Sequence, residues 1–155
     1  MTPAIKQLKK SKISFKTHQY QHDSTVDSFG IEAVEKLYLN AKQVFKTLII
    51  STDTKQLVVA IVPVKYKLNL KSIAKVLQVK KVTMANVNQV QNSTGYILGG
   101  VSPLGQKRKL TTIIDQSAQG FDSIFVSGGK RGLEIELSPQ DLAHLCKANF
   151  ADIIS

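Results

Sequence analysis

The chain has 155 residues, 43% of them hydrophobic, which is enough to bury the core of one domain over residues 1–155 without metal or disulfide support. The chain has 21 lysine and arginine residues against 11 acidic ones, so its formal charge is +10. This charge favours an anionic partner, and nucleic acid is the first candidate. The longest apolar stretch, residues 57–64, is too short to span a bilayer, and residues 1–10 lack the apolar run of a secretory signal. The lone Cys146 cannot form an internal disulfide. These features argue against a membrane or secreted protein and predict a cytoplasmic one.

The first half of the chain carries a helix start and a hairpin signal. Thr2 followed by Pro3 is typical of the N-cap and first position of a helix, here a lysine-rich one. Two β-rich runs, residues 44–51 and 57–64, are joined by a short polar turn, and this spacing predicts an antiparallel hairpin at the sheet centre. The predicted elements are a helix from residue 3, a strand over 13–17, a loop over 21–28, a helix over 31–40 and the two hairpin strands.

The second half predicts further strands between capped helices. Asn69 is suited to cap a helix, and Ser138 followed by Pro139 begins the last one. Because strands outnumber helices and many connections are short, the order predicts an α+β fold with a mixed, largely antiparallel β-sheet surrounded by helices. The predicted elements are helices over residues 70–77, 86–92 and from 139, and strands over 80–84, 110–114, 123–127 and 133–137.

Glycine is concentrated in one part of the chain, since eight of the nine glycines lie within residues 95–132. Such a segment is typical either of a backbone that approaches a ligand closely or of a set of tight turns. Residues 100–107 nearly match a P-loop, but Gln106 stands where that motif needs lysine, and the motif around Ser102 is one residue too long for a nucleophile elbow. Residues 129–132 have KH-like spacing but lie between strands, so we interpret them as a cationic hairpin turn.

Metal and cysteine chemistry are disfavoured by the sequence. His18 and His22 are four residues apart, but a strand followed by a loop does not place them on one face, and the cysteine and carboxylate ligands that zinc prefers are missing nearby. Cys146 shares a helical face with Leu142 and Leu145, which is typical of a small core residue. We therefore expect no metal and no cofactor.

The remaining cations and aromatic residues have two interpretations each. Lys46 lies in an apolar run, so its amine either points to solvent, which the pattern alone favours, or faces a cavity. The basic run at residues 107–109 is normally solvated, and only its position after the glycine segment makes phosphate contacts an alternative. Tyr20 and Phe29 are suited to the core or, beside a basic groove, to stacking on a base.

Five stretches match one family in the same order along the chain. They are Thr-Pro-Ala at residues 2–4, Phe-Lys-Thr-Leu at 45–48, Ser-Thr-Gly-Tyr at 93–96, GGVSPLGQK at 99–107 and VSGGKRGL at 126–133. Over essentially its whole length the chain closely resembles the YbaK-type aminoacyl-tRNA deacylases, relatives of the editing insertion domain of bacterial prolyl-tRNA synthetase. The resemblance implies a strongly bent mixed sheet surrounded by helices. It also implies removal of cysteine wrongly attached to tRNA(Pro), in cooperation with prolyl-tRNA synthetase.

The resemblance further implies which residues form the site. The family's substrate lysine corresponds to Lys46, and its G-x-x-x-P loop to residues 99–103, whose backbone would lie against the aminoacyl ester and the terminal adenosine. Two positions depart from the pattern: relatives carry aspartate or other residues at Glu134 and commonly glycine at Tyr38. The implied residues are Lys46, Gly99 and Gly100 for catalysis, and Tyr20, Phe29, Thr47, Val101, Ser102, Pro103, Ser127 and Glu134 for substrate binding. Weaker tRNA phosphate contacts are expected from Lys107, Arg108, Lys109, Lys130 and Arg131.

For the reaction, the resemblance implies that the thiol of a cysteinyl substrate attacks its own ester. The sequence shows no convincing Ser-His or Cys-His pair, which agrees with a nucleophile supplied by the substrate. Lys46 would then orient the substrate rather than attack it. Two alternatives stay open, an alanyl-tRNA(Pro) deacylase that activates a water molecule and a tRNA-binding module without catalysis.

Overall fold

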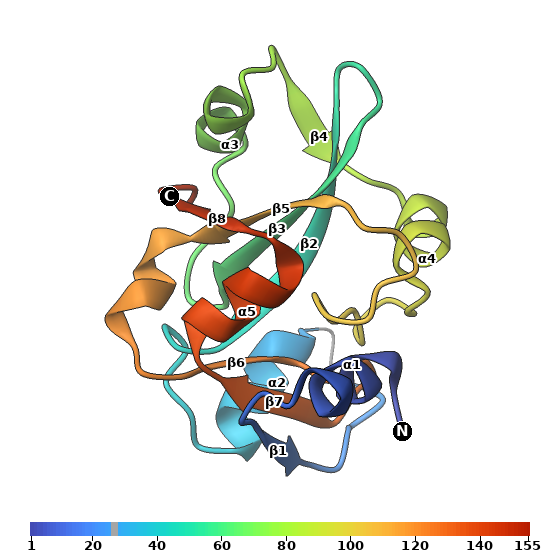
Figure 1. Ribbon diagram of the computed structural model, residues 1–155, viewed down its shortest axis with the longest axis vertical. Coiled ribbons are helices and arrows are strands. Elements are labelled where there is room, and N and C mark those ends of the chain that lie inside the picture. Colours follow the sequence, from blue (N-terminus) through green and yellow to red (C-terminus); the bar gives the residue numbers. More distant parts are fainter. Residues whose placement is uncertain (26–27) are drawn as a thin grey trace.

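The computed structural model describes residues 1–25 and 28–155, so the loop expected over residues 21–28 lies partly outside the described residues. Figure 1 shows two sheets with helices packed around them. The elements in chain order are α1 (Pro3–Ser11), β1 (Lys16–Gln19), α2 (Phe29–Lys36), β2 (Phe45–Thr52), β3 (Leu57–Pro63), α3 (Leu70–Leu77), β4 (Val82–Met84), α4 (Val87–Thr94), β5 (Thr111–Asp115), the 3-10 helix η1 (Gln116–Gly120), β6 (Ile124–Ser127), β7 (Leu133–Leu137), α5 (Pro139–Cys146) and β8 (Asn149–Ala151).

The larger sheet has five strands in the order β4-β2-β3-β5-β8, and the smaller one has three in the order β1-β7-β6. The predicted hairpin is confirmed, because β2 and β3 pair antiparallel from Phe45 opposite Pro63 onward. A parallel bridge between Val44 and Phe125 joins the two sheets, so β2 begins where β6 passes. The predicted α+β class with a mixed sheet is therefore confirmed. In place of one strongly bent sheet, the structure has two sheets that meet at the start of β2.

Parallel pairing is the part of the topology that hairpin spacing did not predict. Strand β5 pairs parallel to both β3 and β8. The connection from β3 to β5 contains α3, β4 and α4, which is the long crossover that a parallel pair needs. Strand β8 and η1 were not predicted from the sequence at all. Both are short, and β8 exists because its backbone pairs with β5.

Helix starts agree with the capping residues in the sequence. The side chains of Thr2, Asn69 and Ser138 each accept a hydrogen bond from a backbone N–H three residues later. Such a cap satisfies one of the N–H groups that a helix leaves unpaired. The caps therefore place α1, α3 and α5 where the sequence predicted them.

The predicted helix over residues 31–40 begins earlier and ends earlier in the structure. Helix α2 runs from Phe29 to Lys36, so Phe29, which follows the predicted loop, is already the first residue of the helix. Tyr38, just beyond it, has φ 55°, a left-handed conformation that glycine adopts at lower cost. Glycine, which the resemblance implies at this position, would therefore adopt this conformation at the end of α2 at lower cost.

The core lies on both faces of the five-stranded sheet. Val59 and Ile61 of β3 belong to one buried cluster, which also contains residues of α1, α5 and the smaller sheet. Their neighbours Val58, Ala60 and Val62 belong to a second cluster, with α3 and β4. Since side chains alternate along a strand, burial on both faces accounts for the continuous apolar run in β3. Among the described residues no helix has the length and apolar character needed to cross a membrane.

Candidate active site

A pocket of about 370 Å³ opens where β2, the start of α2 and the segment after α4 come together. Its wall is mainly apolar and carries polar groups at a few points, as is typical of small-molecule sites. We call it the junction pocket. It brings together nine of the predicted site residues, Tyr20, Phe29, Lys46, Thr47, Gly99, Val101, Ser127, Lys130 and Glu134.

Lys46 supplies a cation to this pocket. It pairs with Val62 across the hairpin and its side chain lines the cavity. Burial, followed by the nearby charge of Lys67, lowers the pKa of its amine. No carboxylate forms an ion pair with Lys46 within the described ranges. A half-buried cation without a counter-ion favours an anionic group that enters the pocket.

Glu134 and Tyr20 supply neutral polar groups. Glu134 lies on β7 opposite Ser127 and is 7% exposed, and burial raises the pKa of its carboxyl to about 8. Burial and the neighbouring Glu134 raise the pKa of the Tyr20 phenol to about 12. At neutral pH the Glu134 carboxyl is therefore mostly protonated and the Tyr20 phenol is neutral. Both side chains can then donate hydrogen bonds to a ligand.

Replacing Glu134 by glutamine is expected to flatten the pH dependence of stability. The carboxyl has a pKa of about 8 when folded and an ordinary pKa near 4.5 when unfolded, so ionisation favours the unfolded chain as pH rises between these values. The free energy of unfolding should fall there with a slope approaching about 1.4 kcal/mol per pH unit. Urea unfolding at several pH values measures the free energy of unfolding of the wild type and of Glu134→Gln. If the two free energies change with pH in parallel, the pKa of Glu134 is not raised.

Two hydroxyl groups at the pocket differ in their hydrogen bonds. Thr47 Oγ1 is buried and has no hydrogen-bond partner in the described part of the chain. Ser127 Oγ accepts the N–H of Gly129 at 3.2 Å. A buried hydroxyl without a partner is costly, so Thr47 has a donor and an acceptor available for a ligand.

The loop at residues 99–103, which we call the glycine loop, is held against α2 by one arginine. The guanidinium of Arg131 lies over the Phe29 ring, 4.2 Å from its centroid, and donates to the carbonyl oxygen of Leu98 at 3.0 Å. Gly99 has φ 88°, and a Cβ there would lie 2.7 Å from both the Phe29 ring and Arg131 Nε. Glycine is therefore required at residue 99 by its conformation and by its neighbours.

The Gly99→Ala substitution is expected to destabilise the fold by at least about 1–2 kcal/mol, the cost of a left-handed conformation for a residue with a Cβ. Contact with Phe29 adds to this cost and displaces the pocket wall. Gly120→Ala is a matched control, because a Cβ there meets nothing within 4 Å. Urea unfolding measures both variants, and equal stabilities would show that the loop is not constrained as described.

The other predicted loop residues lie outside the lining of the junction pocket. The Gly100 N–H donates to Ile97 within the loop, and a Cβ on Gly100 would lie 2.9 Å from the Lys130 Cα. This glycine lets two backbones approach each other. Ser102 is fully buried, and its Oγ accepts the N–H of Leu104. The carbonyl of Pro103 faces the thiol of Cys146 at 3.4 Å. These groups shape the loop, so direct substrate contact by Ser102 or Pro103 stays a prediction.

Helix α1 braces both glycine segments from behind. The Thr2 hydroxyl donates to the Gly128 carbonyl at 2.5 Å, and Gln7 Oε1 accepts the Gly105 N–H at 2.7 Å. A Cβ on Gly105 would lie 2.5 Å from the backbone of Pro3. The Thr-Pro-Ala stretch at residues 2–4 therefore has a structural role, as the support on which the pocket loops rest.

His18, His22 and Cys146 lie outside the lining of the junction pocket. His18 Nε2 lies 2.9 Å from Glu136, and His22 Nδ1 lies 2.6 Å from Glu32. Burial raises the pKa of the Cys146 thiol to about 12 and it packs against the core, as the helical pattern predicted. No three histidine, cysteine or acidic side chains gather as a metal site within residues 1–25 and 28–155.

Comparison with known proteins agrees with this geometry. Residues 24–145 match the model of the aminoacyl-tRNA editing domain. The chain belongs to this family. It is 36% identical over 153 residues to EbsC of Enterococcus faecalis, a protein named as a candidate Cys-tRNA(Pro)/Cys-tRNA(Cys) deacylase, covering 98% of this chain and 92% of that one. The predicted resemblance and the predicted enzyme class, an aminoacyl-tRNA deacylase, are thereby confirmed.

Solved structures show that the fold of this editing domain recurs at low sequence identity. The crystal structure of the hypothetical protein APE2540 has a TM-score of 0.88 at 23% identity and covers 99% of both chains. A crystal structure described as a candidate trans-editing enzyme for prolyl-tRNA synthetase has a TM-score of 0.83 at 19% identity, covering 100% of this chain and 99% of that one. At these identities the matches establish the fold and nothing finer.

The basic residues expected to contact phosphates divide into three groups in the editing domain. Lys130 lines the junction pocket, and Arg131 holds the Leu98 carbonyl beside Phe29. Arg108 and Lys109 line a second hollow, separate from the first. Lys107 lines neither. Residues 107–109 form one basic run in the sequence, but in the structure only Arg108 and Lys109 line the second hollow.

Sequence reasoning missed two parts of the site. The first part is the apolar wall of the junction pocket, which no sequence pattern indicated because apolar residues are ordinary in strands and helices. This wall is formed by Leu48, Met84, Ala85, Val90 and Leu98. The second part is a buried carboxylate, Glu32, which binds His22, Lys36 and the Asp23 N–H. Burial alone would raise its pKa, but these hydrogen bonds hold the pKa at about 2. The network fixes α2 and hence Phe29.

Proposed function

We propose that the chain is a trans-editing deacylase that removes mischarged cysteine from tRNA(Pro). The observation that supports this most strongly is the content of the junction pocket. It presents a cation, neutral donors and a glycine loop, but its described lining holds no cysteine or histidine to form a nucleophile–base pair. Such a pocket can hold and polarise an ester while the nucleophile comes from the substrate. The name of the Enterococcus faecalis relative agrees with this substrate.

In the proposed reaction the substrate's own sulfur breaks the ester. The cysteinyl thiol loses its proton, and its sulfur attacks the carbonyl carbon of the same residue. The bond from that carbon to the ribose oxygen then breaks, the ribose oxygen takes up a proton, and the cargo leaves as a cyclic thioester that water opens to cysteine. A thiol with a pKa of about 8.5 is ionised to several per cent near neutrality, so this step needs only modest activation.

Five residues of the pocket lining have a role in this proposal. The amine of Lys46 attracts the anionic part of the substrate and orients it, because it has no counter-ion of its own in the described structure. The backbone N–H groups of Gly99 and Val101 have no partner among the described residues and are available to the developing oxyanion. Thr47 and Tyr20 offer hydrogen bonds to the terminal ribose or base.

A deacylase that activates water, such as an alanyl-tRNA(Pro) editor, fits the pocket less well. Water activation needs a general base that is free at neutral pH. Burial raises the pKa of Glu134 to about 8, so only a minor fraction of this carboxyl is ionised at neutral pH to act as that base. His18 and His22 contact glutamates and do not line the pocket. The pocket therefore favours a substrate that carries its own nucleophile.

We also propose that the editor works in the cytoplasm and receives its substrate beside prolyl-tRNA synthetase. A small editor contacts little of the tRNA body, so local delivery raises the concentration of the correct substrate. The charge of +10 favours association with tRNA but does not choose among tRNAs.

The test is incubation of the purified chain with tRNA(Pro) carrying radiolabelled cysteine. Release of label from the tRNA above the spontaneous rate is the expected result. If the tRNA is bound but stays acylated, the chain is a tRNA-binding module and the proposed reaction is wrong.

A further inference from the structure

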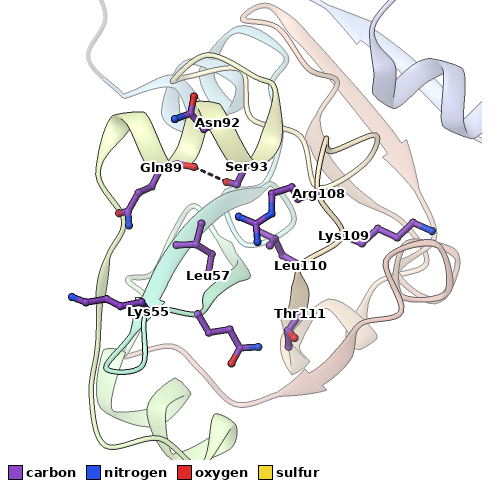
Figure 2. A pocket seen from close by; sticks show the side chains of 10 residues that line it. Lys55, Leu57, Gln89, Asn92, Ser93, Arg108, Lys109, Leu110 and Thr111 are labelled. Atoms are coloured by element: carbon purple, nitrogen blue, oxygen red, sulfur yellow. Dashed lines mark hydrogen bonds between the residues drawn. The ribbon is translucent and has the colours of Figure 1, made fainter.

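A second hollow, of about 570 Å³, lies beside α4 and is lined on three sides by polar segments. One side is the turn from β2 to β3, another is α4, and the third is the segment that enters β5 (Figure 2). We call this hollow the basic groove. It is lined by Lys55, Gln56, Leu57, Gln89, Asn92, Ser93, Arg108, Lys109, Leu110 and Thr111.

The backbone around the basic groove is fixed, whereas its cations are free. The N–H groups of Lys107 and Arg108 donate to the carbonyls of Thr94 and Ser93 at the end of α4, at 3.0 and 2.9 Å. Figure 2 shows the guanidinium of Arg108 reaching over the hollow, whereas the side chains of Lys55 and Lys109 extend outward from its two margins. None of these three cations forms an ion pair within the described residues. The groove thus presents positive charge from defined positions.

The chemistry of the lining matches a ribose-phosphate backbone. Three cations stand among amide and hydroxyl side chains, and no aspartate or glutamate belongs to the described lining. A guanidinium binds phosphate oxygens through paired N–H groups. The amides of Gln56 and Asn92 can donate to and accept from ribose hydroxyls, which distinguish RNA from DNA, and Gln89 keeps its side-chain N–H groups as donors because its Oε1 already accepts the Asn86 N–H. An open groove of this kind suits a polyanionic strand.

The basic groove and the junction pocket share two elements. On α4, Val90 lines the junction pocket and its neighbour Gln89 lines the groove. On the hairpin, Leu48 and Ile49 line the pocket, and the turn beyond β2 supplies Lys55. Successive residues of a helix point about 100° apart, so the two hollows lie on neighbouring faces of α4. A strand that ends in the pocket can therefore follow α4 into the groove.

We propose that the basic groove binds the phosphates of the RNA strand that leads to the acylated 3′ end. This inference rests on the proposed function, because it assumes that the 3′ end enters the junction pocket. Arg108 is the central contact, and Lys55 and Lys109 add positive charge at the margins of the groove. The groove positions the strand and reads no base.

The test is binding of a fluorescent, unacylated RNA hairpin with a single-stranded 3′ end, followed by anisotropy over about 50–200 mM KCl. The Lys55→Glu/Arg108→Glu variant is expected to bind at least about tenfold more weakly at low salt. Its salt slope should fall by about 1 for each phosphate that the groove no longer binds. The control Lys71→Glu/Lys75→Glu changes net charge equally through exposed α3 lysines that line neither hollow. Wild-type affinity in the groove variant, or an equal loss of affinity in the control, would overturn the proposal.

A second readout separates this inference from the proposed function. The groove variant should lose kcat/KM on cysteinyl-tRNA(Pro) but keep the wild-type rate on the cysteinyl ester of adenosine, which is too short to reach the groove. If the wild-type chain cleaves neither substrate, the proposed reaction fails while the anisotropy result still decides the groove. Equal loss on both substrates would mean that the substitutions disturb the junction pocket, and it would overturn the groove as a separate site.

Discussion

Replacing Lys46 by alanine is expected to slow deacylation of cysteinyl-tRNA(Pro) by at least about 100-fold, the usual cost of removing one preorganised charge partner. The amine is half-buried, has no described carboxylate partner and already carries a lowered pKa. An anionic group entering the pocket therefore gains more from this cation than from one in open solvent. Single-turnover rates with labelled cysteinyl-tRNA(Pro) measure the effect.

The Lys46→Arg variant shows which property of the lysine matters. Arginine keeps the charge but needs more room and has a different geometry, so a rate between those of the wild type and Lys46→Ala is expected. Neither variant should unfold more easily than the wild type, since a half-buried, unpaired charge contributes little to stability. Urea unfolding checks this. Wild-type rates in both variants would remove Lys46 from the site.

Exchanging the cargo from cysteine to alanine on the same tRNA(Pro) is expected to slow release by at least about 100-fold. The cysteinyl sulfur attacks within its own residue, so no separate nucleophile has to be bound and oriented. Alanine offers no nucleophile, and the described pocket lining provides no histidine to activate water in its place. Initial rates for the two acylated tRNAs, measured side by side, give the ratio.

Seryl-tRNA(Pro) gives the matched control for cargo size. Serine differs from cysteine by oxygen in place of sulfur, and its hydroxyl is hardly ionised at neutral pH, so its release should be slow although its shape is similar. Rapid release of serine or alanine at the cysteine rate would contradict substrate-assisted attack. It would instead favour a deacylase that activates a water molecule.

Several elements were predictable because their signals are local. The helix caps at Thr2, Asn69 and Ser138 depend on hydrogen bonds that span three residues. The hairpin of β2 and β3 depends on two apolar runs and the short turn between them. By contrast, the parallel pairs of β5 with β3 and β8 involve partners distant in sequence, and no local pattern encodes them.

The candidate site shows the same division. The motifs pointed to Lys46 and Gly99, and both line the junction pocket. They also pointed to Gly100 and Ser102, whose described contacts hold the loop rather than line the cavity. A sequence motif names the residues of a loop together. Which of them face a ligand depends on how the loop is folded back, here by Arg131 and α1.

By itself the sequence determined the charge of this protein, most of its helices and strands, and the glycine segments that permit close backbone approach. These are properties of single residues and of short-range periodicity. Only the tertiary structure decided that Lys46 faces a cavity, that burial raises the pKa of the Glu134 carboxyl, and that Arg108 lies over a groove apart from Lys107. Exposure, pKa and direction are set by the atoms that surround a side chain, and those atoms come from distant parts of the chain.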